Sequence, residues 1–140
     1  MKFMIIVKAT ADSEAGRFPP DSEQMFAAMA QYHEQLAKAG VLLDASGLQP
    51  SSKGWRVRYE GDKRKVVDGP FTESKELIAG YTLIQVRSRD EALEWSRRFP
   101  NPVGAAQPAE IEVRQLYELE DFKDIVQPAT AERFREIGIE

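Results

Sequence analysis

The chain has 140 residues, of which 42% are hydrophobic and 30% are charged, and its formal net charge at pH 7 is -4. This length suits one domain with its own core, and the acidic balance argues against nonspecific nucleic-acid binding, which needs a basic surface. The absence of cysteine excludes disulfides, thiol nucleophiles and thiolate metal sites. No segment approaches the roughly 20 apolar residues of a membrane span. We therefore expect a cytoplasmic protein with no membrane partner and no nucleic-acid partner.

The N-terminal part predicts a strand, a long loop and a helix. Residues 3–7 form an apolar, β-branched run typical of a central strand, and residues 9–20 form a loop of about twice the usual connection length. Asp21 or Ser22 is placed to cap a helix that Gly40 ends. The apolar stripe of this helix comprises Met25, Met29, Tyr32 and Leu36.

The middle of the chain indicates a short extended segment over residues 41–48 and then a hairpin over residues 55–67. In the hairpin, apolar residues alternate with charged ones, which is the period of a half-buried strand. Gly61 and Asp62 suit a two-residue hairpin turn. The alternating apolar residues are Trp55, Val57 and Tyr59.

A strand over residues 80–87 and a second helix over residues 88–99 follow. Ser88 and Glu91 have the spacing of a capping box, in which each side chain accepts a hydrogen bond from the other residue's amide. The buried side of this helix is expected to carry Ala92, Trp95 and Phe99. A last strand is expected over residues 110–119, before a tail with a short helix.

The order of these elements is that of the split βαβ, ferredoxin-like arrangement, an antiparallel sheet with two helices on one face. We therefore expect the α+β class. The other face of such a sheet carries apolar residues that no further element of the chain covers. Packing against a second copy would bury them, so the sequence predicts a symmetric homodimer.

Several segments, above all "VVDGPFTESKELIAGY", "EALEWSRRFPNP" and "EIEVRQLYELEDF", resemble the DGPF-type proteins of the YCII-related family. The resemblance covers residues 1–122 as one domain and leaves residues 123–140 as a tail whose helix is placed to dock on a partner subunit. It implies a dimeric α+β barrel, a bacterial source and, often, a neighbouring gene for an extracytoplasmic-function sigma factor. It also implies that some relatives carry a catalytic His–Asp pair, with the histidine on the first helix, and that one branch acts in chloroaromatic degradation.

His33 and Asp68 are the candidate catalytic residues. His33 lies on the flank of the first helix's apolar stripe, where an imidazole can exchange protons near neutral pH, or can simply be hydrogen-bonded at the edge of the core. The carboxylate of Asp68 can serve the same chemistry, or it can accept amide hydrogens within its own turn. Gly69 and Pro70 are explained by turn formation alone.

Glu73 and Lys75 are candidate ligand-binding residues, because the turn after Asp68 carries more charge than a connection needs. The alternative is a solvated helical turn capped by Thr72. Glu14, in the long first loop, is a candidate for the same pocket. The basic residues of the hairpin form either an anion-binding patch or an ordinary solvated surface.

One histidine and no cysteine make a transition-metal site unexpected, and no dinucleotide, P-loop or serine-hydrolase motif is present. We expect neither a metal nor another cofactor. Two hypotheses remain. The chain is a small enzyme that uses acid–base chemistry for elimination, isomerisation or hydrolysis of an unknown small molecule. Alternatively, it binds a ligand without chemistry or acts as an accessory to a regulator linked to a sigma factor.

Overall fold

The computed structural model describes residues 1–105 and 107–140. Its main sheet has four strands in the order β2–β5–β1–β6, and all neighbouring strands are antiparallel. The strands are β1 (Lys2–Lys8), β2 (Leu42–Gly47), β5 (Ile78–Gln85) and β6 (Ile111–Gln115). This is the strand order of the split βαβ arrangement, so the expected α+β class with an antiparallel sheet is confirmed.

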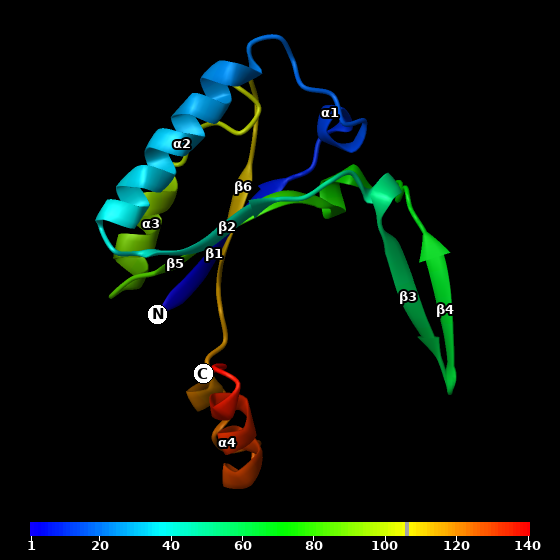
Figure 1. The fold of residues 1–140 in the computed structure, drawn as a ribbon, viewed down its shortest axis with the longest axis vertical. Helices are drawn as coiled ribbons and strands as arrows, with labels where there is room; N and C mark the ends of the chain where they lie inside the picture. The colour runs from blue at the N-terminus through cyan, green and yellow to red at the C-terminus, as the bar shows by residue number, and fades with distance from the viewer. Residues whose placement is uncertain (106) are drawn as a thin grey trace.

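Two helices, α2 (Ser22–Lys38) and α3 (Arg89–Arg97), lie on the same side of this sheet (Figure 1). Their buried residues pack on the inward-facing side chains of the two central strands. The core of the domain therefore lies between the helices and the sheet. It comprises Phe3, Ile5, Tyr32, Leu36, Val41, Ile84, Val86 and Ala92.

The two helices end and begin largely as their sequences indicate. Gly40 follows α2 with φ of 75°, a left-handed conformation that glycine adopts without steric cost. At the start of α3, the Ser88 hydroxyl accepts a hydrogen bond from the Glu91 amide. In a complete capping box the Glu91 carboxylate would accept from the Ser88 amide. Here it accepts instead from the amide of Arg87, the residue before Ser88. Half of the predicted capping box is therefore present.

The loop over residues 9–20 contains a short helix that its sequence pattern did not predict, α1 (Ala11–Glu14). Thr10 and Ser13 cap it reciprocally, because each side-chain oxygen accepts from the other residue's amide, at 3.1 and 2.8 Å. The usual signature of such a box has Glu or Gln in the place of Ser13, so this version carries a weaker sequence signal.

The predicted hairpin is confirmed as β3 (Trp55–Glu60) and β4 (Lys63–Asp68), with Gly61 at φ of 61° in its turn. It forms a separate two-stranded sheet that projects from the body of the domain (Figure 1). The expectation of a half-buried strand is wrong, because Trp55 and Tyr59 are 65% and 68% exposed. The alternation produces an apolar face, but nothing in the described part of the chain covers it.

The face of the main sheet opposite the helices is partly apolar. The strand register places Met4, Ile6 and Leu83 together at its centre. Polar contacts lie around them: Glu112 pairs with Lys8 at 3.0 Å and with Arg114 at 3.2 Å, and the Tyr81 hydroxyl donates to Asp44. This surface has an apolar centre and a polar edge.

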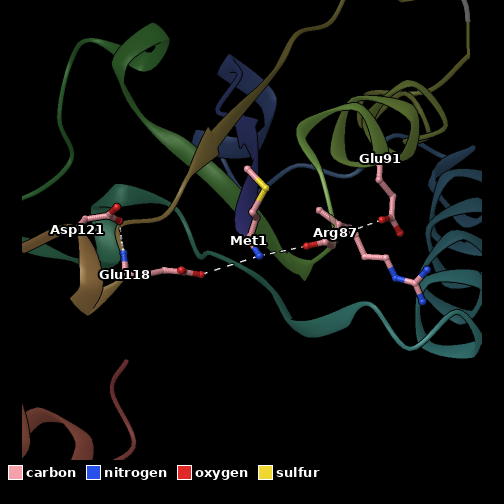
Figure 2. A network of polar contacts seen from close by, with 6 residues as sticks. Met1, Arg87, Glu91, Glu118 and Asp121 are labelled. Atoms are coloured by element: carbon pink, nitrogen blue, oxygen red, sulfur yellow. Dashed lines mark hydrogen bonds and ion pairs between the residues drawn. The ribbon is translucent and has the colours of Figure 1, made fainter.

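The C-terminal tail follows β6 and contains η3 (Leu119–Phe122) and α4 (Pro128–Glu136). Its first turn is attached to the N-terminus, because the Leu116 amide donates to the Lys2 carbonyl and the Met1 ammonium lies 4.0 Å from a Glu118 carboxylate oxygen. Figure 2 shows Met1 facing Glu118, whose amide donates to Asp121. Beyond this anchor, α4 stands clear of the sheet (Figure 1). Among the described residues, no helix has the length and apolar character needed to cross a membrane.

Candidate functional site

A cavity of about 940 Å³ lies between α2, α1 and the face of the sheet that the helices cover. Its lining on the sheet side includes Val7 and Thr82, and its wall opposite the sheet comes from α2 and the segment that precedes it. Most of this lining is apolar, with aromatic rings and thioethers. The main apolar side chains are Val7, Phe18, Met25, Phe26, Met29 and Phe99.

His33 brings a titratable ring to this lining. Its Nδ1 lies 2.7 Å from the carbonyl oxygen of Met29, one helical turn earlier, and its Nε2 lies 2.8 Å from the hydroxyl oxygen of Thr82. A carbonyl oxygen only accepts hydrogen bonds, so Nδ1 must carry hydrogen. In the neutral ring, Nε2 is then the lone-pair nitrogen and accepts from the Thr82 hydroxyl.

The position of Thr82 follows from the pleat of β5. Thr82 pairs with Ile5 on β1 and with Ala45 on β2, so its side chain points to the buried face. It is a polar residue at a buried position, with 2% exposure. The rings of Tyr32 and Phe99 contact the His33 imidazole edge-on, at centroid distances of 5.5 and 6.3 Å. These contacts hold the imidazole plane against the sheet.

The pair of His33 and Thr82 can exchange a proton with a ligand. A hydroxyl both donates and accepts, so Thr82 can donate to the neutral imidazole and accept from the protonated one. Nδ1 is held by the helix backbone, which leaves Nε2 as the ring atom that changes its protonation. A ligand group that reaches Nε2 or the Thr82 hydroxyl from the cavity can therefore take part in acid–base chemistry.

Glu14, the second predicted site residue on the cavity, has a clear structural contact. Its carboxylate accepts from the Ser51 amide at 3.1 Å and also from the Ser51 hydroxyl. The Ser51 hydroxyl oxygen in turn accepts from the Phe71 amide at 3.0 Å. Glu14 thus joins α1 to the 3-10 turn η1 (Ser51–Lys53) and to the segment after the hairpin.

Asp68 lies outside the cavity lining. It is an exposed residue at the end of β4, paired with Trp55 across the hairpin. The next residue, Gly69, donates its amide to the Gly54 carbonyl at 3.0 Å, and a Cβ atom there would lie 1.9 Å from the Ser51 carbonyl oxygen. This close approach explains the glycine of the Asp-Gly-Pro motif.

Glu73 and Lys75 are also exposed and lie around the 3-10 turn η2 (Ser74–Glu76), outside the cavity lining. The structure therefore brings His33 and Glu14 to one cavity and places the other three predicted site residues elsewhere. The ring nitrogens of His33 contact Met29 and Thr82, and Asp68 is not among their partners. Across residues 1–105 and 107–140, no group of three His, Asp or Glu side chains is arranged to hold a metal.

Sequence reasoning missed Thr82 and Ser51. Thr82 carries a detectable signal, because it occupies the inward phase of the alternation in "YTLIQV" where its neighbours of the same phase are Ile and Val. A lone polar residue in that phase needs a partner inside the protein. Ser51 has no such signal, since it lies in a turn where serine is common.

The fold and the cavity define an α+β domain with a histidine on a largely apolar pocket. A family model described as the YCII-related domain matches residues 1–120, and the chain belongs to this family. An uncharacterised protein from Rhizobium meliloti is 29% identical over 97 residues, covering 69% of this chain and 78% of the relative.

A solved structure, 5-chloro-2-hydroxyhydroquinone dehydrochlorinase from Burkholderia phenoliruptrix in complex with 2,5-dihydroxybenzoquinone, is 15% identical. The alignment covers 84% of this chain and 95% of that chain with a TM-score of 0.41, a likeness too low to support an inference about activity.

Proposed function

We propose that this protein binds a small molecule in the cavity beside α2 and that His33 is its acid–base group. The observation that carries the proposal is the placement of His33 on the cavity lining with Nδ1 held as a donor and Nε2 facing a hydroxyl. The chemistry such a group supports is proton transfer, as in elimination, isomerisation or hydrolysis.

The lining indicates the class of ligand. The volume of about 940 Å³ is at the upper end of the range typical of small-molecule pockets, roughly 300–1,000 Å³. Its aromatic and thioether side chains favour a largely apolar molecule. The ligand also needs one polar group able to exchange a proton with Nε2 of His33 or with the Thr82 hydroxyl.

Asp68, Glu73 and Lys75 remain predictions as site residues. Their side chains are exposed and lie outside the cavity lining, so the proposal does not depend on them. In this proposal Glu14 has a positioning role, because its carboxylate is used by Ser51.

We also propose that the protein is a homodimer in which the faces opposite the helices pack together, giving a dimeric α+β barrel. The apolar centre formed by Met4, Ile6 and Leu83 and the polar edge around it support this arrangement. Light scattering after size-exclusion chromatography should give a dimer for the wild type and a monomer for Ile6→Glu. Leu93→Glu, on the exposed side of α3, is the control and should remain dimeric. A monomeric wild type at micromolar concentration would contradict the proposal.

The function is tested with a metabolite library screened for ligands that raise the unfolding temperature of the wild type, and each hit is then assayed for conversion. His33→Gln replaces the imidazole with an amide of similar size that has no basic nitrogen. Glu34→Gln is the matched control, because Glu34 is exposed and adjacent on α2. We expect His33→Gln to lower turnover by about 10²- to 10⁴-fold, the usual contribution of a general acid–base group, while Glu34→Gln changes it little.

Two other results are informative. Binding that is retained by both variants, with no conversion by the wild type, would support a ligand-binding protein without chemistry. Hits whose chemical-shift changes all lie away from His33 and Met29 would refute the cavity as the site. The accessory role in a sigma-factor response stays a prediction of the family resemblance, and co-purification of a regulator with the wild type is its test.

A further inference from the structure

Two segments that project from the domain both carry exposed apolar side chains. On the hairpin these are Trp55, Val57, Tyr59 and Val66, and in the tail they are Ile125, Phe134, Ile137 and Ile139. Figure 1 shows the hairpin and α4 apart from each other and from the sheet. An apolar surface this concentrated on two extensions of one small domain indicates that each has a partner.

The exposed residues of the hairpin form one continuous strip. Trp55, Val57 and Tyr59 alternate along β3 and therefore share a face, and Val66 lies directly across from Val57 on β4. The Arg64 guanidinium, across from Tyr59, stacks on that ring at 4.6 Å and extends the strip at its end. This strip, defined by these residues, is apolar, with Arg64 at one end and Asp68, which pairs with Trp55, at the other.

The tail presents a short amphipathic element. Phe134 and Ile137 are three residues apart at the end of α4 and so lie on one side of it, and the Ile139 amide folds back to donate to the Phe134 carbonyl at 2.9 Å. Ile125 and Ile137 are 80% and 71% exposed. The tail therefore carries an exposed apolar side of its own.

The charges of the two segments are opposite. Over residues 55–68 the basic side chains are Arg56, Arg58, Lys63, Arg64 and Lys65, against acidic Glu60, Asp62 and Asp68. Over residues 123–140 the acidic side chains are Asp124, Glu132, Glu136 and Glu140, against basic Lys123, Arg133 and Arg135. In the tail, Lys123 and Arg135 already pair with Glu120 and Glu132. No ion pair among the described residues involves a basic residue of the hairpin.

Both segments are anchored at their bases and lie apart in one chain (Figure 1). The hairpin follows β2, at one edge of the sheet, and is held by the Glu14–Ser51 contacts and the Gly69–Gly54 bond. The tail follows β6, at the opposite edge, and is held by its contacts with Met1 and Lys2. A second copy can present its own hairpin to the tail without moving either base.

We propose that the tail of one copy packs its apolar residues on the hairpin strip of a second copy. In a two-fold dimer this contact occurs twice, since the same two surfaces are reciprocally available. The contact would bury the exposed apolar residues of both segments and bring the acidic tail against the basic hairpin. It assigns a role to residues 123–140, which lie beyond the family match.

Engineered cysteines provide the test, because the natural chain contains none. Val57→Cys and Ile137→Cys are made in separate full-length chains, one of them tagged, which are co-expressed and then oxidised mildly. We expect a covalent heterodimer in at least about tenfold excess over the control pair Leu93→Cys with Ile137→Cys, because docking raises the local concentration of the two thiols. Leu93 is a suitable control, since it is exposed on α3, away from the strip.

Three further measurements complete the design. Adding Trp55→Asp to the hairpin chain should reduce the heterodimer to the level of the control pair. Raising the salt concentration should lower the rate of cross-linking, because the segments carry opposite charges. The chain that carries both Val57→Cys and Ile137→Cys should form covalent dimers. If it closes on itself as a monomer, or if the heterodimer forms no faster than the control, the proposal is refuted.

This result is independent of the sheet-face dimer. Loss of the tail contact with the wild-type dimer intact would refute the present proposal alone.

Discussion

The Thr82 hydroxyl and the His33 imidazole lie 2.8 Å apart although 49 residues separate them in the chain. The contact joins β5 to α2 and determines which nitrogen of the ring faces the sheet.

This contact predicts the tautomer of His33. Since the chain has one histidine, its imidazole nitrogens can be observed by NMR without assignment ambiguity. We expect the neutral ring of the wild type to carry hydrogen on Nδ1. Thr82→Val should remove the partner of Nε2 and lower the free energy of unfolding by about 1–3 kcal/mol, as for a buried group that loses its hydrogen bond. Thr82→Ser keeps the hydroxyl and should preserve the tautomer; a ring protonated mainly on Nε2 in the wild type would contradict the contact.

The phenol of Tyr32 predicts a loss of stability at alkaline pH. Burial raises the pKa of Tyr32 from 10.0 to about 12, and the nearby Arg98 charge opposes this only in part. As pH rises, the unfolded chain loses this proton first, near 10. The stabilisation present below pH 10 is therefore lost between pH 10 and about 12, by about 2–3 kcal/mol.

Tyr32→Phe tests this effect. The variant loses the hydrogen bond that the Tyr32 hydroxyl donates to the Trp95 carbonyl at 2.7 Å, which costs about 1 kcal/mol at pH 7. The same carbonyl still accepts from the Arg98 amide. Urea denaturation at pH 7, 10 and 11.5 should show the wild type losing its advantage as pH rises. Parallel pH profiles for the two proteins would show that Tyr32 is not responsible.

The close packing at Gly69 predicts that no side chain is tolerated there. Gly69→Ala would place a Cβ atom against the Ser51 carbonyl, so the turn after the hairpin must move. We expect a loss of at least about 2 kcal/mol in the free energy of unfolding, in the range of severe single substitutions, and faster amide hydrogen exchange at Phe71. Gly47→Ala is the control, because a Cβ atom at that position would have no atom within 4 Å. Equal stability of the two variants would contradict this interpretation of the motif.

The core of the domain predicts a contrast between two leucines on helices. Leu36 on α2 is fully buried, whereas Leu93 on α3 is 40% exposed. Leu36→Ala should lower the free energy of unfolding by about 2–5 kcal/mol, as expected when a buried leucine is replaced by alanine, and Leu93→Ala by much less. Chemical denaturation of both variants measures the difference; similar losses would place the core elsewhere.

Sequence periodicity was sufficient for most helices and strands, because their apolar patterns repeat over several turns or pleats. It failed for the burial of the hairpin, since the alternation of Trp55, Val57 and Tyr59 is the same whether the covering surface comes from the same chain or from another. It also failed for contacts between distant segments. Nothing in the sequence near Glu14 indicates Ser51, 37 residues later, and nothing near His33 indicates Thr82. Such pairs depend on how the loops return to the sheet.

The cavity has two walls that differ in how firmly they are attached to the domain, and the contact between Glu14 and Ser51 holds the weaker one. The wall formed by α2 and the sheet is continuous with the hydrophobic core, so opening it requires unfolding of the domain. The wall formed by α1 has no buried residue of its own and is held to η1 by the acceptor contacts of one carboxylate. Exchange of a ligand between the cavity and bulk water should therefore have the activation energy of breaking these contacts, well below that of global unfolding.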